Sequence, residues 1–260
     1  MEQPEKRALS ERIRRVLWIW HKLAAVNFIC FLIFLPVFTW FYLVLNTYAH
    51  AGLPIGVALL LPGLGYFSEL LLRLPPGIFY ALFAISAVLF GPFLFGLHYF
   101  VSATLMERHV WISDLFVQAK QHARRGIPAG LCLVAGTHLL LWNIFGGVIA
   151  FAPWVSLLLT VSRWVSMGLL LFLVLALPYF CQITVWTDLP LSATLKNARI
   201  LTRVYLGRGL LLLLVIGIFW WGALSLIPVL GLASLPLILI GGTAFAQAAV
   251  CLPVMERHVL

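Results

Sequence analysis

The chain has 260 residues, of which 63% are hydrophobic and 10% are charged, whereas a soluble domain carries about 25% charged residues. So few polar side chains cannot cover a water-exposed surface, which excludes a soluble globular domain and a disordered chain. The apolar runs are long and continuous, unlike the short alternating strands of an outer-membrane barrel. We therefore predict an all-α fold, a polytopic membrane helix bundle with about six transmembrane helices.

The chain begins with a basic segment over 1–20, predicted to be cytoplasmic, and the rest, 21–260, is expected to form a single transmembrane domain. A first span is predicted over 21–46, because its apolar run is much longer than the core of a signal peptide, about 7–15 residues. The next stretch, 48–76, is apolar but is broken repeatedly by proline and glycine. It is expected to form an interfacial or re-entrant segment on the outer side.

Five later apolar runs are long enough to cross a bilayer, since a spanning helix needs about 20 apolar residues. These spans are predicted at 78–104, 128–150, 164–186, 208–227 and 231–253.

Two polar stretches, 113–125 and 190–206, separate some of these spans and carry both apolar and basic side chains. Each is predicted to form an amphipathic helix in the headgroup layer. A Ser/Thr-Asp-Leu sequence stands at or just before the start of each stretch, and its first residue, Ser113 or Thr187, is a candidate helix N-cap. The two sequences lie 74 residues apart, and the pentapeptide MERHV also occurs twice. This pattern indicates an internal duplication of a span–amphipathic helix–span unit.

The basic residues lie unevenly along this topology. With six spans, both termini and both amphipathic helices share one side, which holds 15 of the 17 lysines and arginines. The exceptions are Arg73 and Arg163. The positive-inside rule makes that side cytoplasmic, so both termini are expected inside. Short basic patches beside apolar runs are typical of membrane orientation rather than of nucleic-acid binding, and no nucleic acid partner is expected.

Residues 89–131 contain several features in a fixed order: a Gly-Pro pair within a span, an aromatic pair a few residues later, a short polar loop and an aromatic amphipathic segment. The residues concerned are Gly91-Pro92, Tyr99-Phe100, Arg108 and Asp114-Leu115-Phe116. In this the chain resembles the YesL-type family of bacterial integral membrane proteins, and 177–201 is also similar to that family. The resemblance implies the bacterial cell (inner) membrane. Because some members accompany genes for complex-sugar uptake, it also implies transport or assistance to transport. The apolar stretch 48–76 and His98 depart from the family pattern.

Polar side chains within the predicted spans are few, and none is a carboxylate, which disfavours a proton- or sodium-coupled carrier. The candidate polar path of a small uncoupled channel consists of Asn27, His98, His138 and Asn143. The alternative interpretation is that these side chains form interhelical hydrogen bonds worth about 0.6 kcal/mol each.

The basic side chains of the two amphipathic helices are candidate contacts for anionic lipid headgroups or for a partner protein, at about 1 kcal/mol each. They are Lys120, Arg124, Arg125, Lys196, Arg199 and Arg203. They are equally explained by a role in topology alone. Arg163, at the outer end of the fourth span, is either a candidate anion contact or a side chain that reaches to the interface.

The sequence contains no nucleophile motif, no phosphate-binding glycine loop and no metal-ligand spacing. We therefore expect no cofactor, no metal and no catalytic residue. Our leading hypothesis is a membrane protein that assists solute transport, carbohydrate included, by binding transporter subunits. One alternative is the small channel. Another is a membrane enzyme acting on lipid-linked substrates, with acid–base pairs formed by His109 with Glu107 and by His258 with Glu256. The oligomeric state stays open.

Overall fold

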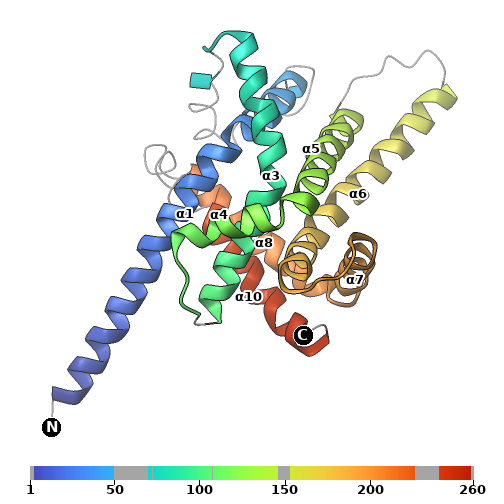
Figure 1. Ribbon diagram of the computed structural model, residues 1–260. Coiled ribbons are helices and arrows are strands. Elements are labelled where there is room, and N and C mark those ends of the chain that lie inside the picture. Colours follow the sequence, from blue (N-terminus) through green and yellow to red (C-terminus); the bar gives the residue numbers. More distant parts are fainter. Residues whose placement is uncertain are drawn as a thin grey trace.

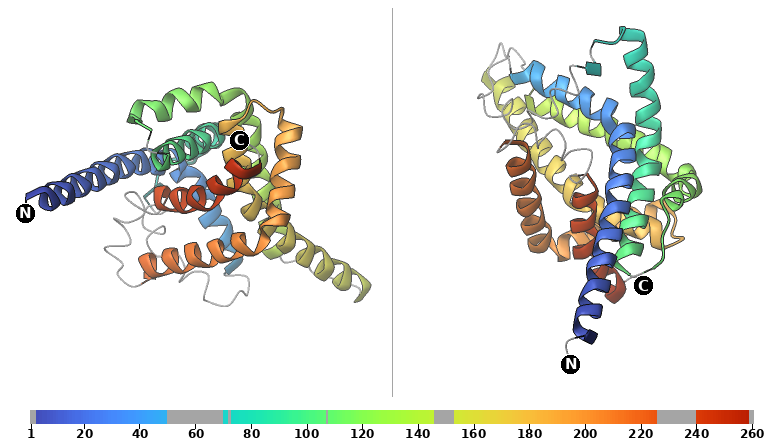
Figure 2. Two further views of the ribbon diagram at one scale, coloured as in Figure 1. Left: turned by 90° about the horizontal axis from the view of Figure 1, so that it is seen from below. Right: turned by 90° about the vertical axis from the view of Figure 1, so that its left-hand side faces the viewer.

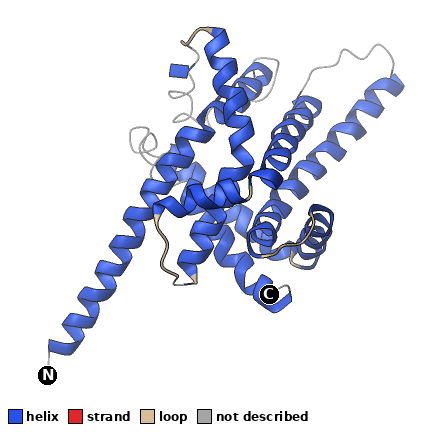
Figure 3. Ribbon diagram, in the orientation of Figure 1, coloured by secondary structure: helices blue, strands red, loops and turns tan. Residues whose placement is uncertain are grey.

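The structure is a computed structural model, which describes residues 3–49, 70–71, 73–106, 108–145, 153–225 and 240–258. All regular structure in these residues is helical, as predicted (Figure 3). The helices are α1 (Gln3–Ala49), α3 (Pro76–Leu105), α4 (Ile112–Gln121), α5 (Ala123–Phe145), α6 (Pro153–Trp186), α7 (Leu191–Val204), α8 (Leu206–Ser225) and α10 (Ile240–His258). Most of the predicted segment 48–76, and the parts of two predicted spans at 146–150 and 231–239, lie outside the described residues.

Four helices contain a stretch long and apolar enough to cross a membrane. These stretches are Trp20–Leu43, Pro76–Leu105, Ala123–Ile144 and Ser156–Trp186. Helices α7 and α8 meet the same test only together, as a pair bent by 85°, and α10 carries a shorter apolar stretch, Ile240–Met255. The chain is therefore a helical membrane protein whose described residues contain four candidate spans, or five if the bent pair counts as one. The predicted number of six stays a prediction.

Two predicted boundaries differ from the structure. The fourth span was expected to start at 164, but α6 begins at Pro153 and continues through Arg163. Polar residues do not interrupt the helix there, because a hydroxyl can bond to its own backbone: Oγ1 of Thr160 donates to the carbonyl of Ser156 at 2.8 Å. The amphipathic helix expected over 113–125 breaks at His122, where α4 has already ended and α5 is about to begin.

The predicted N-caps are also wrong. Helix α4 starts after Trp111, not Ser113, and the Trp111 amide donates to Oδ2 of Asp114 at 2.8 Å. Thr187 does not start a helix but directly follows the end of α6, where its hydroxyl donates to the carbonyl of Ile183 at 2.7 Å. Helix α7 begins after Pro190.

Helix α3 is the centre of the bundle and packs against α1, α4, α5, α6 and α10 (Figures 1 and 2). The largest core cluster joins α1 to α3, α4 and α10 through buried side chains such as Phe34, Phe100, Leu115 and Ala244. Aromatic pairs contribute to it, with the rings of Phe34 and Phe90 at 4.7 Å. Burial of such rings is a main source of packing energy between helices in lipid, where no hydrophobic force draws them together.

Helices α3 and α5 cross at their glycines. A Cβ atom added to Gly91 would lie 1.9 Å from the carbonyl oxygen of Gly126, and one added to Gly130 would lie 2.5 Å from the amide nitrogen of Gly91. The two backbones therefore touch directly, which requires residues without side chains at this crossing.

The polar loops gather at one end of the bundle, which we call the basic end and define by Lys22, Val110, Arg125 and Asp188. The ammonium of Lys22 in α1 donates to the carbonyl of Val110, between α3 and α4. Nη2 of Arg125 in α5 donates to the carbonyl of Asp188, between α6 and α7, at 3.4 Å. The first turns of α1 and the last turns of α10 both lie toward the bottom of the view in Figure 1.

Candidate functional site

The four residues of the candidate polar path all bond to partners outside that set. In α3, Nδ1 of His98 lies 3.3 Å from Nε2 of Gln182 in α6, and both side chains are buried. Oδ1 of Asn27 in α1 accepts from the backbone amide of Gly241 in α10. Both contacts join two helices within the bundle.

The other two path residues lie further toward the opposite end of the bundle. Nε1 of Trp40 in α1 donates to Nδ1 of His138 in α5 at 3.3 Å. Nδ2 of Asn143 in α5 donates to the hydroxyls of Ser162 and Ser166 in α6, at 2.6 Å and 2.7 Å. All four side chains thus form the interhelical hydrogen bonds of the alternative interpretation, and a shared path stays a prediction.

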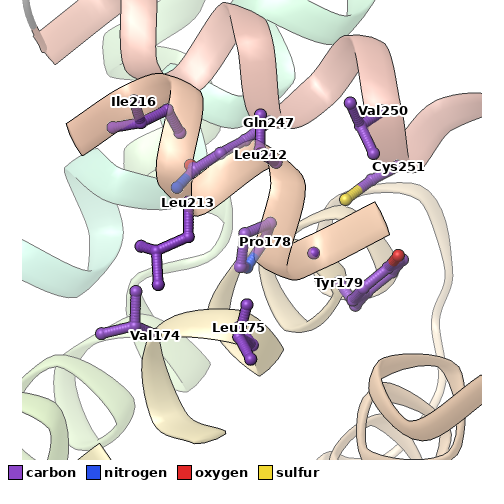
Figure 4. A pocket seen from close by; sticks show the side chains of 11 residues that line it. Val174, Leu175, Pro178, Tyr179, Leu212, Leu213, Ile216, Gln247, Val250 and Cys251 are labelled. Carbon is purple, nitrogen blue, oxygen red and sulfur yellow. The ribbon is translucent and has the colours of Figure 1, made fainter. Parts of the chain in front are cut away.

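Two cavities lie elsewhere in the bundle. The smaller, about 20 Å³, lies between α6, α8 and α10, with Tyr179, Gln247 and Cys251 at its wall (Figure 4). A volume of this size holds roughly one water molecule. The larger, about 590 Å³, is a groove between α5 and α6, floored by α3 and closed off at one end by α7. We call it the α5/α6 groove. Its lining is apolar except for Arg199, and the four path residues do not line it.

The six basic candidates lie on α4, on α7 and at the start of α5. Five are exposed: Lys120, Arg124, Lys196, Arg199 and Arg203. The sixth, Arg125, is half-buried through its contact with Asp188. On α7 the basic residues recur at intervals of three and four, so they share one face of the helix. The opposite face, which includes Ala198 and Leu201, is buried.

Both amphipathic helices also expose apolar side chains. Helix α4 packs on α3 through Leu115 and Ala119, yet Trp111, Phe116 and Val117 are 60%, 47% and 56% exposed. Helix α7 exposes Leu195, Ile200 and Val204 beside its basic residues. Surfaces that combine apolar and basic side chains in this way suit a membrane interface or a protein partner.

Sequence reasoning missed two cation–π contacts at the basic end. Nζ of Lys22 lies 4.7 Å from the ring of Trp111, and the guanidinium of Arg108 lies 4.8 Å from the ring of Trp186. Trp186 also stacks on Tyr99 at 5.4 Å and donates to the hydroxyl of Ser102 at 3.0 Å. The sequence contained a signal for these contacts, because tryptophans at the boundary of a span, next to basic residues, are suited to cation–π contacts.

His122, at the break between α4 and α5, is half-buried and lies near two charges. Burial and the positive charge of Arg125 lower its pKa from the usual value, while Asp188 acts in the opposite direction. Its ring also meets that of Phe95 edge-on at 6.2 Å. The imidazole is therefore held toward its neutral form at the point where the two helices meet.

Arg163 lies within α6, on the side away from the basic end. At about 1.5 Å per residue it is about 35 Å from Trp186 along the helix, whereas the hydrocarbon core is about 30 Å thick. With Trp186 at one surface of the hydrocarbon core, Arg163 lies at the opposite surface. This position agrees with a side chain at the membrane interface and not with one inside the hydrocarbon core.

The proposed acid–base pairs are only partly described. His109 is exposed and its ring lies 5.0 Å from that of Trp111. The side chains of Glu107, Glu256 and His258 lie outside the described residues. Within the described part of the chain, no group of three histidine, cysteine or acidic side chains is placed to hold a metal ion.

These features define the class: a polytopic helical membrane protein whose buried polar side chains join helices and whose basic end carries two amphipathic helices. Comparisons of the chain with models of protein families, with curated proteins and with solved structures found no match.

Proposed function

We propose that this protein assists solute transport by docking to a transporter subunit through α4 and α7 on the cytoplasmic side of a bacterial inner membrane. The single observation that carries the proposal is the mixed surface of these helices. After α4 has packed on α3, its apolar side chains Phe116 and Val117 are still half exposed, close to the basic Lys120. Such a surface gains free energy when a partner or the bilayer interface covers it.

The orientation rests on the distribution of charge. The contacts of Lys22 and Arg125 bring the basic segments to one end of the bundle, and the positive-inside rule assigns such an end to the cytoplasm. A transporter's cytoplasmic loops would then lie at the same level as α4 and α7.

The polar residues favour an accessory over a channel. A neutral conducting path needs polar groups turned toward a common cavity, whereas His98, His138, Asn143 and Asn27 bond across helix pairs. The larger cavity has an apolar lining that offers little to a hydrated solute. Carbohydrate as the transported class is supported only by the family resemblance.

Site-specific photo-crosslinking in cells tests the proposal. A photoreactive residue is introduced at Val117 of α4 or at Arg203 of α7, both exposed, and at Leu214 of α8 as the control, also exposed but on an apolar helix. We expect covalent adducts with a transporter subunit from the first two positions and none from Leu214. Adducts with lipid alone at all three positions, or equal protein adducts at Leu214, would contradict docking by α4 and α7.

A further inference from the structure

The α5/α6 groove is widened by a missing side chain at one glycine of α5. Helix α5 lines the groove with Leu133 and Leu140 on either side of Gly136, and a Cβ atom added to Gly136 would meet nothing within 4 Å. Side chains of α6, such as Phe172 and Leu173, line the opposite wall, and a space of about 590 Å³ stays open between the helices. Volumes in this range are typical of ligand sites.

The length of the groove matches one leaflet of a bilayer. It extends from Pro128 to Leu140 on α5 and from Leu169 to Phe180 on α6. At about 1.5 Å per residue these stretches measure about 16–18 Å, and half of a hydrocarbon core of about 30 Å is about 15 Å.

The two ends of the groove differ. Asn143 donates to Ser162 and Ser166 one turn beyond the innermost lining residues, so hydrogen bonds hold α5 and α6 together there. At the other end α7 lies across the basic end of the bundle and contributes the exposed guanidinium of Arg199. Arg124 and Arg125 lie about one turn before Pro128 on α5, which adds positive charge to the same end.

We propose that the α5/α6 groove binds one anionic phospholipid of the leaflet at the basic end, with an acyl chain between α5 and α6 and the headgroup phosphate on Arg199. Charge complementarity favours this occupant. The α5/α6 groove is apolar, about one leaflet long and carries a guanidinium at its headgroup end, which matches an acyl chain attached to a phosphate group. A peptide segment would bring backbone polar groups into this apolar lining, at a cost of several kcal/mol for each unpaired group. The inference does not depend on transporter docking, because α4 does not line the groove and the headgroup contact needs only Arg199 of α7.

Native mass spectrometry of the full-length protein tests the inference. The protein is reconstituted into vesicles of phosphatidylglycerol and phosphatidylcholine in equal amounts and then extracted gently. The variants are Arg199→Gln, which removes the charge, and Gly136→Leu, which fills the groove. The matched controls are Arg257→Gln, an exposed arginine near the end of α10, and Gly217→Leu on α8, where an added Cβ also meets nothing within 4 Å.

The native protein and both controls are expected to retain one phosphatidylglycerol. Retention falls about fivefold in Arg199→Gln, equivalent to about 1 kcal/mol for one basic side chain at a membrane surface, and it is lost for both lipids in Gly136→Leu. Equal retention of the two lipids by the native protein would overturn the anionic assignment. Unchanged retention in both groove variants, or a dimer that only Gly136→Leu disrupts, would overturn the groove as a lipid site.

Discussion

Nδ1 of His98 lies 3.3 Å from Nε2 of Gln182, with both side chains buried where α3 passes α6. The residues are 84 positions apart in sequence, yet each supplies the other with a polar partner. Oε1 of Gln182 has no partner among the described residues, so this amide makes its hydrogen bond to the histidine from an otherwise apolar helix face. The pair joins two long helices near the last turns of both, and so favours one register between them.

Removal of either member of this pair should destabilise the protein. We expect Gln182→Leu or His98→Leu to lower the free energy of unfolding by about 1–3 kcal/mol, because the remaining polar group stays buried without a partner. The double variant should lose less than the sum of the two, with a coupling of about 0.6 kcal/mol. Unfolding in detergent, followed across the double-mutant cycle, measures this coupling. Strictly additive losses would mean that the two side chains do not interact.

The crossing of α3 and α5 should tolerate no added methyl group. Gly91→Ala places a Cβ atom against the backbone of Gly126, and overpacking of this kind costs about 1–3 kcal/mol. Gly136→Ala is the matched control on the partner helix, where the added atom meets open space and helix propensity favours alanine by about 1 kcal/mol. Midpoints of thermal unfolding should move in opposite directions for the two variants. An unchanged midpoint for Gly91→Ala would contradict direct backbone contact.

Stability should fall on mild acidification because of His122. Burial and, to a smaller extent, the charge of Arg125 lower the pKa of His122 in the folded protein from the ordinary value of 6.5. At a pH below 6.5 the histidine therefore binds more protons in the unfolded chain than in the folded protein. Protonation therefore favours the unfolded state, and the loss begins as the pH falls through that value. Comparison of unfolding free energies at neutral pH and below pH 6.5 measures the effect. In His122→Gln the free energy of unfolding should depend less on pH, whereas in the nearby control Gln121→Ala its pH dependence should be unchanged. The same pH dependence in the native protein and in His122→Gln would contradict the role given to His122.

The cation–π contact of Arg108 with Trp186 should contribute measurably to the basic end. With the guanidinium 4.8 Å from the ring, Arg108→Gln is expected to cost about 0.5–1 kcal/mol. Arg124→Gln, an exposed charge on the neighbouring helix, serves as the control, with an expected change below about 0.5 kcal/mol. Quenching of tryptophan fluorescence, read together with unfolding midpoints, follows both variants. Equal small effects for the two would show that Arg108 acts only through its charge.

The sequence predicted the class of fold and the positions of the best-defined spans. The span expected at 78–104 corresponds to α3 (Pro76–Leu105) within two residues, because prolines precede a continuous apolar run that ends in a polar loop. The fourth span was placed too late, because a hydropathy criterion stops at Arg163 whereas a helix continues as long as its backbone bonds do. The break at His122 was missed for a related reason: residues 113–125 are amphipathic throughout, and nothing in that pattern marks a change of helix axis.

The candidate site could be predicted only in part. The basic faces of α4 and α7 follow from helical spacing, which is local in the sequence. The pairing of His98 with Gln182, and of Asn143 with Ser166, depends on how each helix is rotated about its axis, which single-residue patterns do not specify. The α5/α6 groove was also missed, since it depends on how α5 and α6 are spaced and on which side of α5 Gly136 lies.

The central claim, that α4 and α7 dock to a transporter, is tested most directly by purification of the tagged protein from its native membrane in mild detergent, followed by mass spectrometry of proteins and lipids. We predict stoichiometric recovery of a transporter subunit with the native protein. That recovery should be lost in a Val117→Asp/Arg203→Glu variant that is still inserted and folded. Recovery of the native protein alone or with lipid only would contradict the claim, as would recovery of the subunit unchanged by the substitutions.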